Sequence, residues 1–561
     1  MRLPLQGTSL SLFLIAILGF TPYVGAKYNP DENYIESEAV QARYPEPDEA
    51  ITSPAFTHPK TDFTSQAEME TFIDEILAIN PLVRHRILGL SQNGRKLHAL
   101  IFTQEGIATP AVINRNGKPT LLLIAQQHGN ETAAGEAALA YAYSLASGKE
   151  GDILAKLNLI IMPRANPDGA EEYERDLANG FNLNRDHLLL TTPEGKALAT
   201  FFNEYQPDVV LDSHEFSVAG RWITKFGGLQ LPDGAIQYST IAHQYSGIVP
   251  FSEQPFKHEL LSAFDKAGLK HDWYFTSSST NNEDKTIAMG GINADIGRNV
   301  SGLRNSISFL LETRGFGLGQ GNFKRRVYTH LVAIRSIADT TVTHAKLVLD
   351  NHRAFNQAVI DSAGKGEIIV LSKAAAEQRE VSFVDETTGE LITHLVDWRS
   401  ALTIEPLLTR ARPYGYLLAP TETEAAARLR LLGLEVYKLT TPTTVDLEAY
   451  AVKEAKGGVK FDVTGAIGKA GNEMVEVKTE LVPLQLVADE SYYYVPLAQP
   501  LANLAVAAME PESQSSYLAN NIFVFPQVSN KERLPFYRLM QATYLPLVLW
   551  EAPADIHVKA N

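Results

Sequence analysis

The sequence predicts an α/β fold, with a mainly parallel or mixed twisted sheet flanked by helices over residues 61–350. Five apolar runs lack the alternation of half-exposed strands, so they match strands that are buried on both faces. Helical patterns, such as the alanine-rich segment 132–146, lie between several of these runs. The chain has 561 residues, 45% of them apolar, which is enough for more than one domain with a substantial core.

The N-terminus has the pattern of an export signal. Arg2 is followed by an apolar stretch at 10–20 and then by small residues that end at Ala26. This pattern predicts a cleaved signal peptide over residues 1–26. The apolar stretch is shorter than the ~20 residues that a membrane span needs, so we expect no stable span after cleavage. The chain has no cysteine and therefore no disulfides. Together these features predict an exported protein, periplasmic or extracellular.

The elements after the signal follow in order along the chain. Residues 27–60 are polar and proline-rich, and we interpret them as an extended N-terminal arm. Strands are then predicted at 97–103, 120–125, 157–163, 208–214 and 306–312. A long helix predicted at 328–352 closes this domain.

The pattern changes after about residue 351. Short runs with period-2 alternation occur at 366–372, 379–385, 414–420 and 434–440. One helix, 422–433, is predicted among them. We therefore predict a C-terminal accessory region over residues 351–561, α+β or β-rich, in which we find no catalytic motif.

The charge of the chain restricts its partners. The formal net charge is -16, and no run is rich in lysine or arginine. This balance argues against nucleic acid or an anionic membrane surface as the main partner. It leaves small substrates open, because a local basic pocket can lie in an acidic protein.

Four groups with metal or acid–base chemistry stand at the ends of predicted strands. His128 follows the strand 120–125, Glu131 comes three residues later, and His214 and Glu312 each end a further strand. Taken singly, each has a structural explanation, such as a carboxylate that complements a helix dipole. In parallel α/β sheets, however, ligands bind beyond the C-terminal strand ends. Two histidines and one carboxylate leave a fourth zinc position for water, and a further carboxylate can take a proton from that water.

The segment 162–187 follows a third strand and belongs to the same edge of the sheet. It contains turn-forming residues, including an NPDG sequence, together with Arg164, Arg175 and Arg185. Arginines in such a place can form forked hydrogen bonds to a carboxylate or an oxyanion. Without the other motifs, a simple turn and surface charge would explain the segment equally well.

Taken in order, these motifs resemble the zinc carboxypeptidase family of the carboxypeptidase A/B type. The ordered motifs are HGNE from 128, NPDG from 166, NLNRD from 182, DSH from 212 and LLETRG from 310. The resemblance covers about residues 61–348 and says nothing secure about the last third. On this basis the chain resembles a secreted bacterial-type member with an extra C-terminal region and a zinc carboxypeptidase-like fold.

The resemblance implies a metal site and a catalytic base. His128, Glu131 and His214 would bind one zinc ion per chain. Glu312 would be the general base, which takes a proton from the attacking water and returns it to the leaving amine.

The resemblance also implies a substrate clamp. Asn184 and Arg185 would hold the terminal carboxylate of the substrate, which makes such an enzyme an exopeptidase. Arg175 would stabilise the oxyanion of the tetrahedral intermediate, with Arg164 as the alternative.

The chain departs from the family pattern in two places. Asn182 stands where the family commonly has an aspartate that orients a zinc-bound histidine, and Asp186 is a possible substitute. The tyrosine that caps the substrate is not fixed by a motif, although Tyr274 is a candidate. In the stretch 289–306, which should form the specificity pocket, Asp295 would favour basic terminal residues and Arg298 acidic ones.

The function implied is that of a zinc metallocarboxypeptidase acting on peptides or on peptidoglycan stem peptides. A zinc deacylase of the aspartoacylase or succinylglutamate-desuccinylase type is the second enzyme hypothesis. The NPDG element and the export signal favour the peptidase. A third hypothesis is an inactive peptide-binding protein, but the ligand and base positions are all filled.

Overall fold

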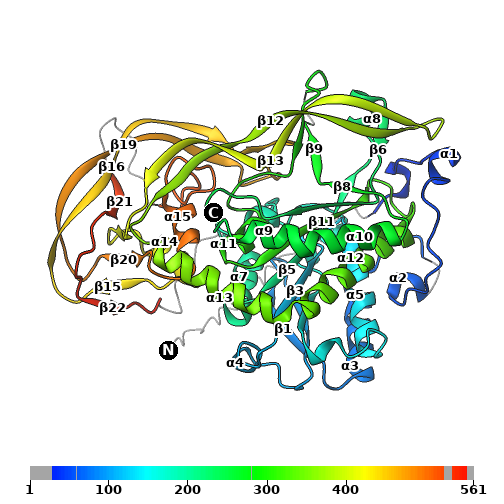
Figure 1. Ribbon diagram of the computed structural model, residues 1–561, viewed down its shortest axis with the longest axis horizontal. Helices are drawn as coiled ribbons and strands as arrows, with labels where there is room; N and C mark the ends of the chain where they lie inside the picture. The colour runs from blue at the N-terminus through cyan, green and yellow to red at the C-terminus, as the bar shows by residue number, and fades with distance from the viewer. Residues whose placement is uncertain (1–27, 58–59, 279–280, 524–532, 553–561) are drawn as a thin grey trace, which may run out of the picture.

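The computed structural model describes residues 28–57, 60–278, 281–523 and 533–552 (Figure 1). The predicted signal peptide, residues 1–26, lies outside these residues. Within them, no helix has both the length and the apolar character that a membrane crossing requires.

An eight-stranded mixed sheet forms the centre of the part of the chain before about residue 350, which is called the first region below (Figure 1). The neighbouring strands β4, β3, β5 and β11 run parallel, whereas β2 and β7 pair antiparallel with the edges of this group. This confirms the predicted mixed α/β class. In spatial order the strands are β1 (Arg84–Leu90), β2 (Lys96–Phe102), β4 (Asn158–Met162), β3 (Thr120–Ala125), β5 (Val209–Ser217), β11 (Ile307–Phe316), β7 (Gly234–Tyr238) and β8 (His271–Trp273).

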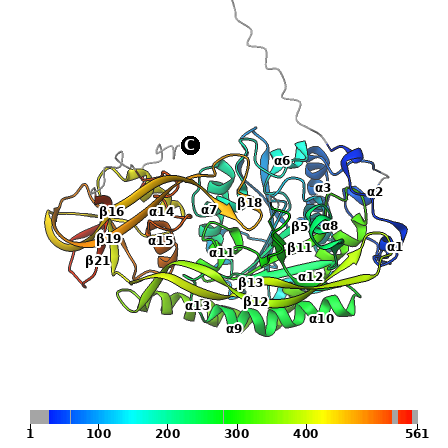
Figure 2. The same ribbon diagram turned by 90° about the horizontal axis from the view of Figure 1, so that it is seen from above.

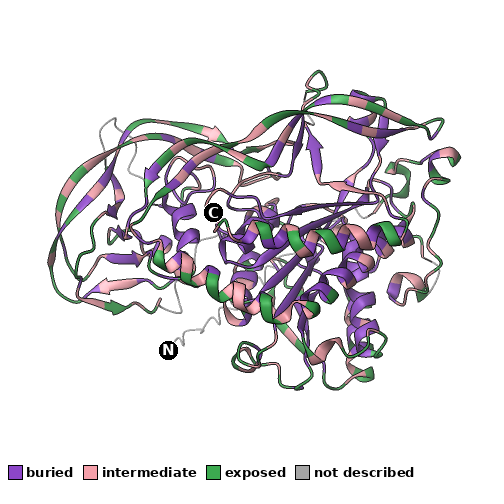
Figure 3. Ribbon diagram, in the orientation of Figure 1, coloured by how far each residue is buried: buried purple, intermediate pink, exposed green. Residues whose placement is uncertain are grey.

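Helices cover both faces of this sheet, so its central strands are buried along almost their whole length (Figure 3). Along β3, Leu121 and Leu123 pack in one hydrophobic core, and the alternate residues Leu122 and Ile124 pack in another. This two-sided burial explains the continuous apolar runs. The first core is shared with α3 (Gln66–Ile79), α5 (Thr132–Ala146), α10 (His258–Lys266) and α12 (Phe323–Thr343), and the second with α4 (Pro110–Ile113) and α7 (Pro193–Tyr205).

The long helix predicted at 328–352 is two helices. The first, α12, ends at Thr343, and α13 (Ala345–Asp361) begins after His344, whose φ of -109° and ψ of 21° leave the helical region. The break follows the run Thr340–Thr343, in which every residue is β-branched and therefore disfavours helix.

A long antiparallel ribbon connects the C-terminal residues to the first region (Figure 1). It consists of β12 (Glu367–Asp385) and β13 (Leu391–Ala411). The runs predicted at 366–372 and 379–385 are the two ends of the single strand β12. The ribbon forms a five-stranded sheet with β6 (Gly228–Gln230), β9 (Phe275–Ser277) and β10 (Ile287–Met289).

The rest of the C-terminal residues form a seven-stranded sheet in which every pair is antiparallel within the described residues, as expected for a β-rich region. The boundary placed between 350 and 351 stays a prediction, and α13 spans it. The elements of this part are β14 (Gly415–Leu418), α14 (Thr423–Leu431), β15 (Tyr437–Leu439), β16 (Thr443–Val459), β19 (Glu473–Ala488), β20 (Tyr493–Pro496), α15 (Ala502–Met509), β21 (Arg533–Leu539) and β22 (Leu547–Leu549).

The N-terminal arm lies along the first region and contains three short helices, η1 (Pro30–Glu32), α1 (Glu38–Gln41) and α2 (Pro54–Thr57). Its Glu36 forms a buried ion pair with Arg314 of β11 at 2.7 Å. The ring of Tyr44 lies 3.6 Å from the same guanidinium. The arm therefore neutralises a buried charge on the strand that also carries Glu312.

Replacing Glu36 with alanine is expected to lower the free energy of unfolding by about 3 kcal/mol, because a buried arginine loses its partner. Denaturant unfolding of the purified variant measures this loss. Glu38→Ala, at an exposed position on the same arm, is the control. Equal stability of the two variants would contradict the role assigned to the ion pair.

Candidate metal centre

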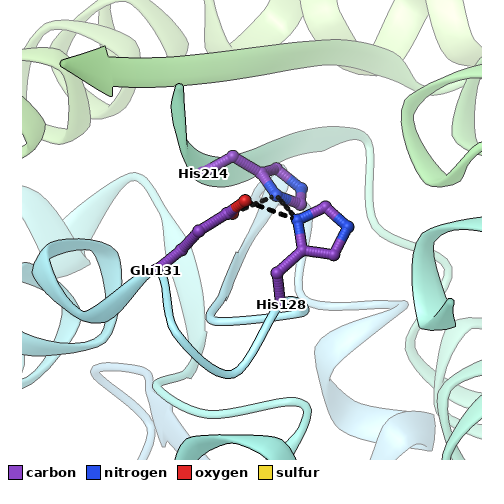
Figure 4. A group of neighbouring side chains, drawn as sticks. All are labelled: His128, Glu131 and His214. Carbon is purple, nitrogen blue, oxygen red and sulfur yellow. Dashed lines mark hydrogen bonds and ion pairs between the residues drawn. The ribbon is translucent and has the colours of Figure 1, made fainter. Parts of the chain in front are cut away.

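Three side chains converge just beyond the end of β3 and in the second half of β5, which continues past His214 to Ser217 (Figure 4). The Nδ1 atom of His128 lies 2.7 Å from one oxygen of Glu131, and the Nδ1 atom of His214 lies 2.8 Å from the other. The two Nδ1 atoms are 3.1 Å apart. All three residues are buried, and their ligand atoms lie within 4.8 Å of one another.

This donor set fits a zinc ion. Two nitrogens at 2.0–2.1 Å from a tetrahedral zinc lie roughly 3.3 Å apart, close to the 3.1 Å between the histidine nitrogens. Imidazole nitrogens and a carboxylate are zinc ligands, and three protein ligands leave one position for water or substrate. The triad is therefore a site for one catalytic rather than structural zinc ion.

A close contact between two glycines shapes the loop that carries His128 and Glu131. A side chain on Gly129 would lie 2.0 Å from the backbone of Gly169, so the HGNE and NPDG motifs need glycine where they touch. The NPDG segment also opens α6 (Pro167–Glu172), and Asn166 caps this helix by accepting from the Gly169 amide. Its side-chain amide donates to the carbonyls of Arg175 and Asp176. NPDG is thus more than a turn, because it positions Arg175.

Alternation along β5 separates the metal ligand from a structural carboxylate. The side chain of His214 points toward His128 and Glu131, whereas the side chain of Glu215 forms a buried ion pair with Arg326 of α12. Glu215 also accepts from the backbone amide of Ala133, in the first turn of α5. The carboxylate therefore fixes the start of α5, immediately after Glu131.

Pairing of β11 with β5 places Glu312 beside the triad. The two strands are parallel, and Glu312 is the register partner of His214. Neighbouring strands lie about 4.8 Å apart, so the two side chains stand next to each other at the sheet edge. Burial, together with the Glu131 carboxylate, raises the pKa of Glu312 to about 8.

The two histidines have different partners at their outer nitrogens. His214 Nε2 lies 2.8 Å from the carboxylate of Asp212, whereas His128 Nε2 lies 3.3 Å from the amide oxygen of Asn182. Burial lowers the pKa of His214, but Asp212 and Glu131 outweigh it and hold the pKa well above its usual value. For His128, burial and the Arg175 charge lower the pKa to about 4. Zinc must therefore displace a proton from His214, and we expect zinc affinity to fall as the pH falls.

Asp186 does not take the place of the missing aspartate. Both of its carboxylate oxygens accept hydrogen bonds from Thr191 and Thr192, in the turn before α7. Asn182 occupies the orienting position itself, with an uncharged acceptor.

Replacing Asn182 with aspartate is expected to tighten zinc binding about tenfold, because a carboxylate raises the basicity of the histidine ligand. Competition with a chromophoric chelator measures the affinity. Asn179→Asp, an exposed change in the same loop, is the control. Unchanged or weaker binding in Asn182→Asp would contradict this role.

Of the two arginines considered for the oxyanion, Arg175 lies at the triad. Its Nη1 atom donates to Glu131 at 2.9 Å, and its side chain is 43% exposed, within reach of a substrate. Arg164 is buried and donates to Gln126 and to the carbonyl of Thr64. Arg164 therefore joins the segment before α3 to the loop that follows β3.

The predicted clamp residues lie in the short helix η3 (Leu183–Arg185) beside the triad. The side-chain amide nitrogen of Asn184 is 3.3 Å from His214 Nε2, and its oxygen accepts from the Gly297 amide at 2.8 Å. Arg185 forms an ion pair at 2.7 Å with Asp462, a residue of the C-terminal region.

Residues of the predicted specificity stretch are buried. Asp295 and Arg298 are both almost fully buried, so neither is a surface group. Burial lowers the pKa of Arg298 to about 10 and raises that of Asp295, near which Lys460 and Arg185 lie. Tyr274 follows β8, and burial with the nearby Glu312 carboxylate raises its pKa.

Asp212 is a site residue with no role predicted from the sequence, although it begins the DSH motif. The alternation of β5 indicates it, because residues 212 and 214 share one face of the strand. A buried chain continues from it, since Gln127 donates to Asp212 at 2.6 Å and also contacts His187 at 2.6 Å.

The amino-acid sequence of this chain is similar to those of known carboxypeptidases. Residues 69–323 match the family model described as zinc carboxypeptidase. The chain is 28% identical over 502 residues to Carboxypeptidase 2 of Trichophyton rubrum, covering 87% of this chain and 91% of the relative. It is 27% identical over 528 residues to Carboxypeptidase 2 of Trichophyton equinum, covering 91% and 95%. Both alignments therefore extend well into the C-terminal region.

Solved structures are more distant. The metallo-carboxypeptidase from Pseudomonas aeruginosa has 18% identity and a TM-score of 0.38, covering 52% of this chain and 70% of that chain. Carboxypeptidase A from Helicoverpa armigera has 15% identity and a TM-score of 0.39, covering 51% and 75%. The matched family model, the fungal relatives and the buried His–Glu–His triad together identify residues 69–323 as a zinc carboxypeptidase region and the protein as a peptide hydrolase.

Proposed function

We propose that the protein removes single residues from the C-terminus of peptides, and that Glu312, Arg175, Asn184 and Arg185 carry out this reaction around the zinc site. The observation that carries the proposal is the register of β5 and β11, which sets a buried carboxylate beside a metal ligand. A base in that place is what hydrolysis at the triad requires.

Each side chain has one role in the proposed hydrolysis. Asn184 and Arg185 bind the terminal carboxylate and so place the last peptide bond at the triad. Glu312 takes a proton from the attacking water while the oxygen of that water forms a bond to the carbonyl carbon of the peptide. The same residue then donates that proton to the amine as the carbon–nitrogen bond breaks. Arg175 donates to the carbonyl oxygen as negative charge develops there.

The ionisation of Glu312 sets the pH dependence of this reaction. Zinc held by the triad supplies Lewis acidity, which polarises the carbonyl and lowers the pKa of water. A metal ion held by the triad would bring positive charge near Glu312 and so hold its pKa below the value of about 8 that burial and the Glu131 carboxylate produce. The base must be ionised, so activity is lost as the pH falls through this pKa.

The substrate and location are proposals that depend on the sequence. We propose that the mature protein acts outside the cytoplasm of a bacterium, on peptides or on peptidoglycan stem peptides. The pattern of residues 1–26 and the absence of cysteine support an exported protein. The peptide substrate follows from the family.

The test is mass spectrometry of peptides and peptidoglycan fragments incubated with the mature protein, with and without a zinc chelator. We expect chelator-sensitive loss of single C-terminal residues, restored by added zinc. The Glu312→Gln variant, prepared identically, controls for contaminating peptidases. Cleavage restricted to stem peptides would identify wall turnover as the role. Bound zinc without any cleavage would contradict the proposal and favour a deacylase.

A further inference from the structure

The hairpin of β16 and β19 reaches from the C-terminal sheet to the first region, which carries the metal site and is called the catalytic region below. In Figure 2 its tip, labelled β18, extends from the C-terminal sheet toward the first region, where it contacts Arg185. The tip comprises residues 460–472, with the two-residue strands β17 (Phe461–Asp462) and β18 (Gly465–Ala466). It is the part of the C-terminal region that contacts the predicted clamp.

Asp462 places its carboxylate on the clamp arginine. Its Oδ2 atom accepts from Arg185 Nη2 at 2.7 Å, and the two side chains are only 13% and 14% exposed. Its other oxygen accepts from the backbone amide of Thr464 at 2.8 Å and from the Thr464 hydroxyl. The carboxylate is therefore fixed in orientation, with one oxygen directed at the guanidinium.

The remaining donors of Arg185 show how a substrate can approach. Its Nη1 atom donates to the carbonyl of Asn184 at 2.7 Å. Its Nε atom is buried and has no hydrogen-bond partner among the described residues. A carboxylate that grips arginine in the usual forked manner needs two adjacent nitrogens. The free Nε and its neighbour Nη2 form such a pair, and Asp462 already holds one of the two N–H groups of Nη2.

Contacts on the far side of the tip fix it to the loop that carries Arg175. The backbone amides of Lys469 and Ala470 both donate to the carbonyl of Gly180 at 3.0 Å. The Lys469 ammonium forms an ion pair with Glu174 at 2.7 Å. The tip is thus a wall of the substrate site, packed against the segment between Glu174 and Arg185.

We propose that Asp462 is a specificity-determining residue, whose carboxylate occupies the place of the substrate's terminal carboxylate and is displaced when a peptide binds. This inference rests on the proposed function of Arg185. A second carboxylate on the Nε–Nη2 pair would lie next to the carboxylate of Asp462 and be repelled by it, so a substrate carboxylate displaces Asp462 and takes its place as the partner of Arg185. A terminus without a carboxylate cannot compensate Arg185 and leaves Asp462 in place.

The test compares a good substrate, identified from the peptide pool, with the same peptide ending in an amide. Wild type, Asp462→Asn, Asp462→Ala and the control Glu473→Gln are assayed as zinc-loaded proteins; Glu473 is exposed on the same hairpin. We expect both Asp462 variants to lower KM for the carboxylate peptide by about threefold or more. The inhibition constant of the amide peptide should change by less than twofold in every variant.

Three outcomes would overturn the inference. Unchanged or higher KM in both Asp462 variants would mean that the carboxylate positions Arg185 instead of competing for it. Equal tightening of the carboxylate and amide peptides would mean that the tip acts as a steric barrier. An effect as large in Glu473→Gln would mean that general charge is responsible. Failure of the wild type to release C-terminal residues would instead contradict the proposed function itself.

Discussion

Replacing Glu312 with glutamine is expected to reduce kcat by roughly 10²–10⁴-fold while zinc stays bound, because the amide cannot accept the proton of the attacking water. Glutamine keeps the size of the side chain, and Glu312 is not one of the three converging ligands. The loss should therefore appear in turnover and not in metal content. Steady-state kinetics and elemental analysis of the same preparation measure the two quantities.

The pH profile separates a base from a structural carboxylate at this position. In the wild type, kcat should fall on the acid side as Glu312 becomes protonated, at a pH below the value of about 8 for the buried group. The residual activity of the glutamine variant should lack this limb. A variant that keeps wild-type turnover, or keeps the acid limb, would remove Glu312 from the mechanism.

Replacing His128 with alanine is expected to weaken zinc binding by more than the 10–100-fold that loss of a supporting residue causes, because one of three ligands is lost. The remaining pair, Glu131 and His214, would hold the metal less tightly and leave two positions to water. Zinc content after dialysis against a weak chelator measures the change. Activity should return in part when excess zinc is added.

A second histidine variant controls for effects on folding. His85 lies on β1 and contacts His98, away from the triad. His85→Ala should retain wild-type zinc content after the same dialysis. If His128→Ala also kept its full zinc content, His128 would not be a ligand. If both variants lost zinc equally, the loss would reflect stability and not coordination.

The residues of the metal site were accessible from sequence because two local rules apply to them. His128 and Glu131 are three residues apart at a strand-to-helix junction, and the carboxyl ends of parallel strands share one edge of the sheet. His214 and Glu312 follow from the same rule, since β5 and β11 are neighbours. Asp212 follows from strand alternation once His214 is placed.

The C-terminal contribution to the site depends on long-range pairing that no local pattern encodes. Asp462 meets Arg185 only because β16 and β19 pair along their whole length and carry the tip across. The sequence pattern predicts two short strands, 366–372 and 379–385, where the structure has the single strand β12. Its register with β13 shifts between Ala374 and Ala375, among other places, and its middle is rich in residues with good helix propensity.

The ribbon of β12 and β13 has a consequence for how the chain folds. Gly228 pairs with Asp385, and Ile287 pairs with Trp398, so strands of the catalytic region complete their sheet with residues that are synthesised much later. Until the ribbon forms, β6 and β10 expose backbone groups that can pair with other chains. Contacts this distant in sequence slow folding. The enzyme therefore reaches its finished catalytic region only after the ribbon, far along the chain, has been made.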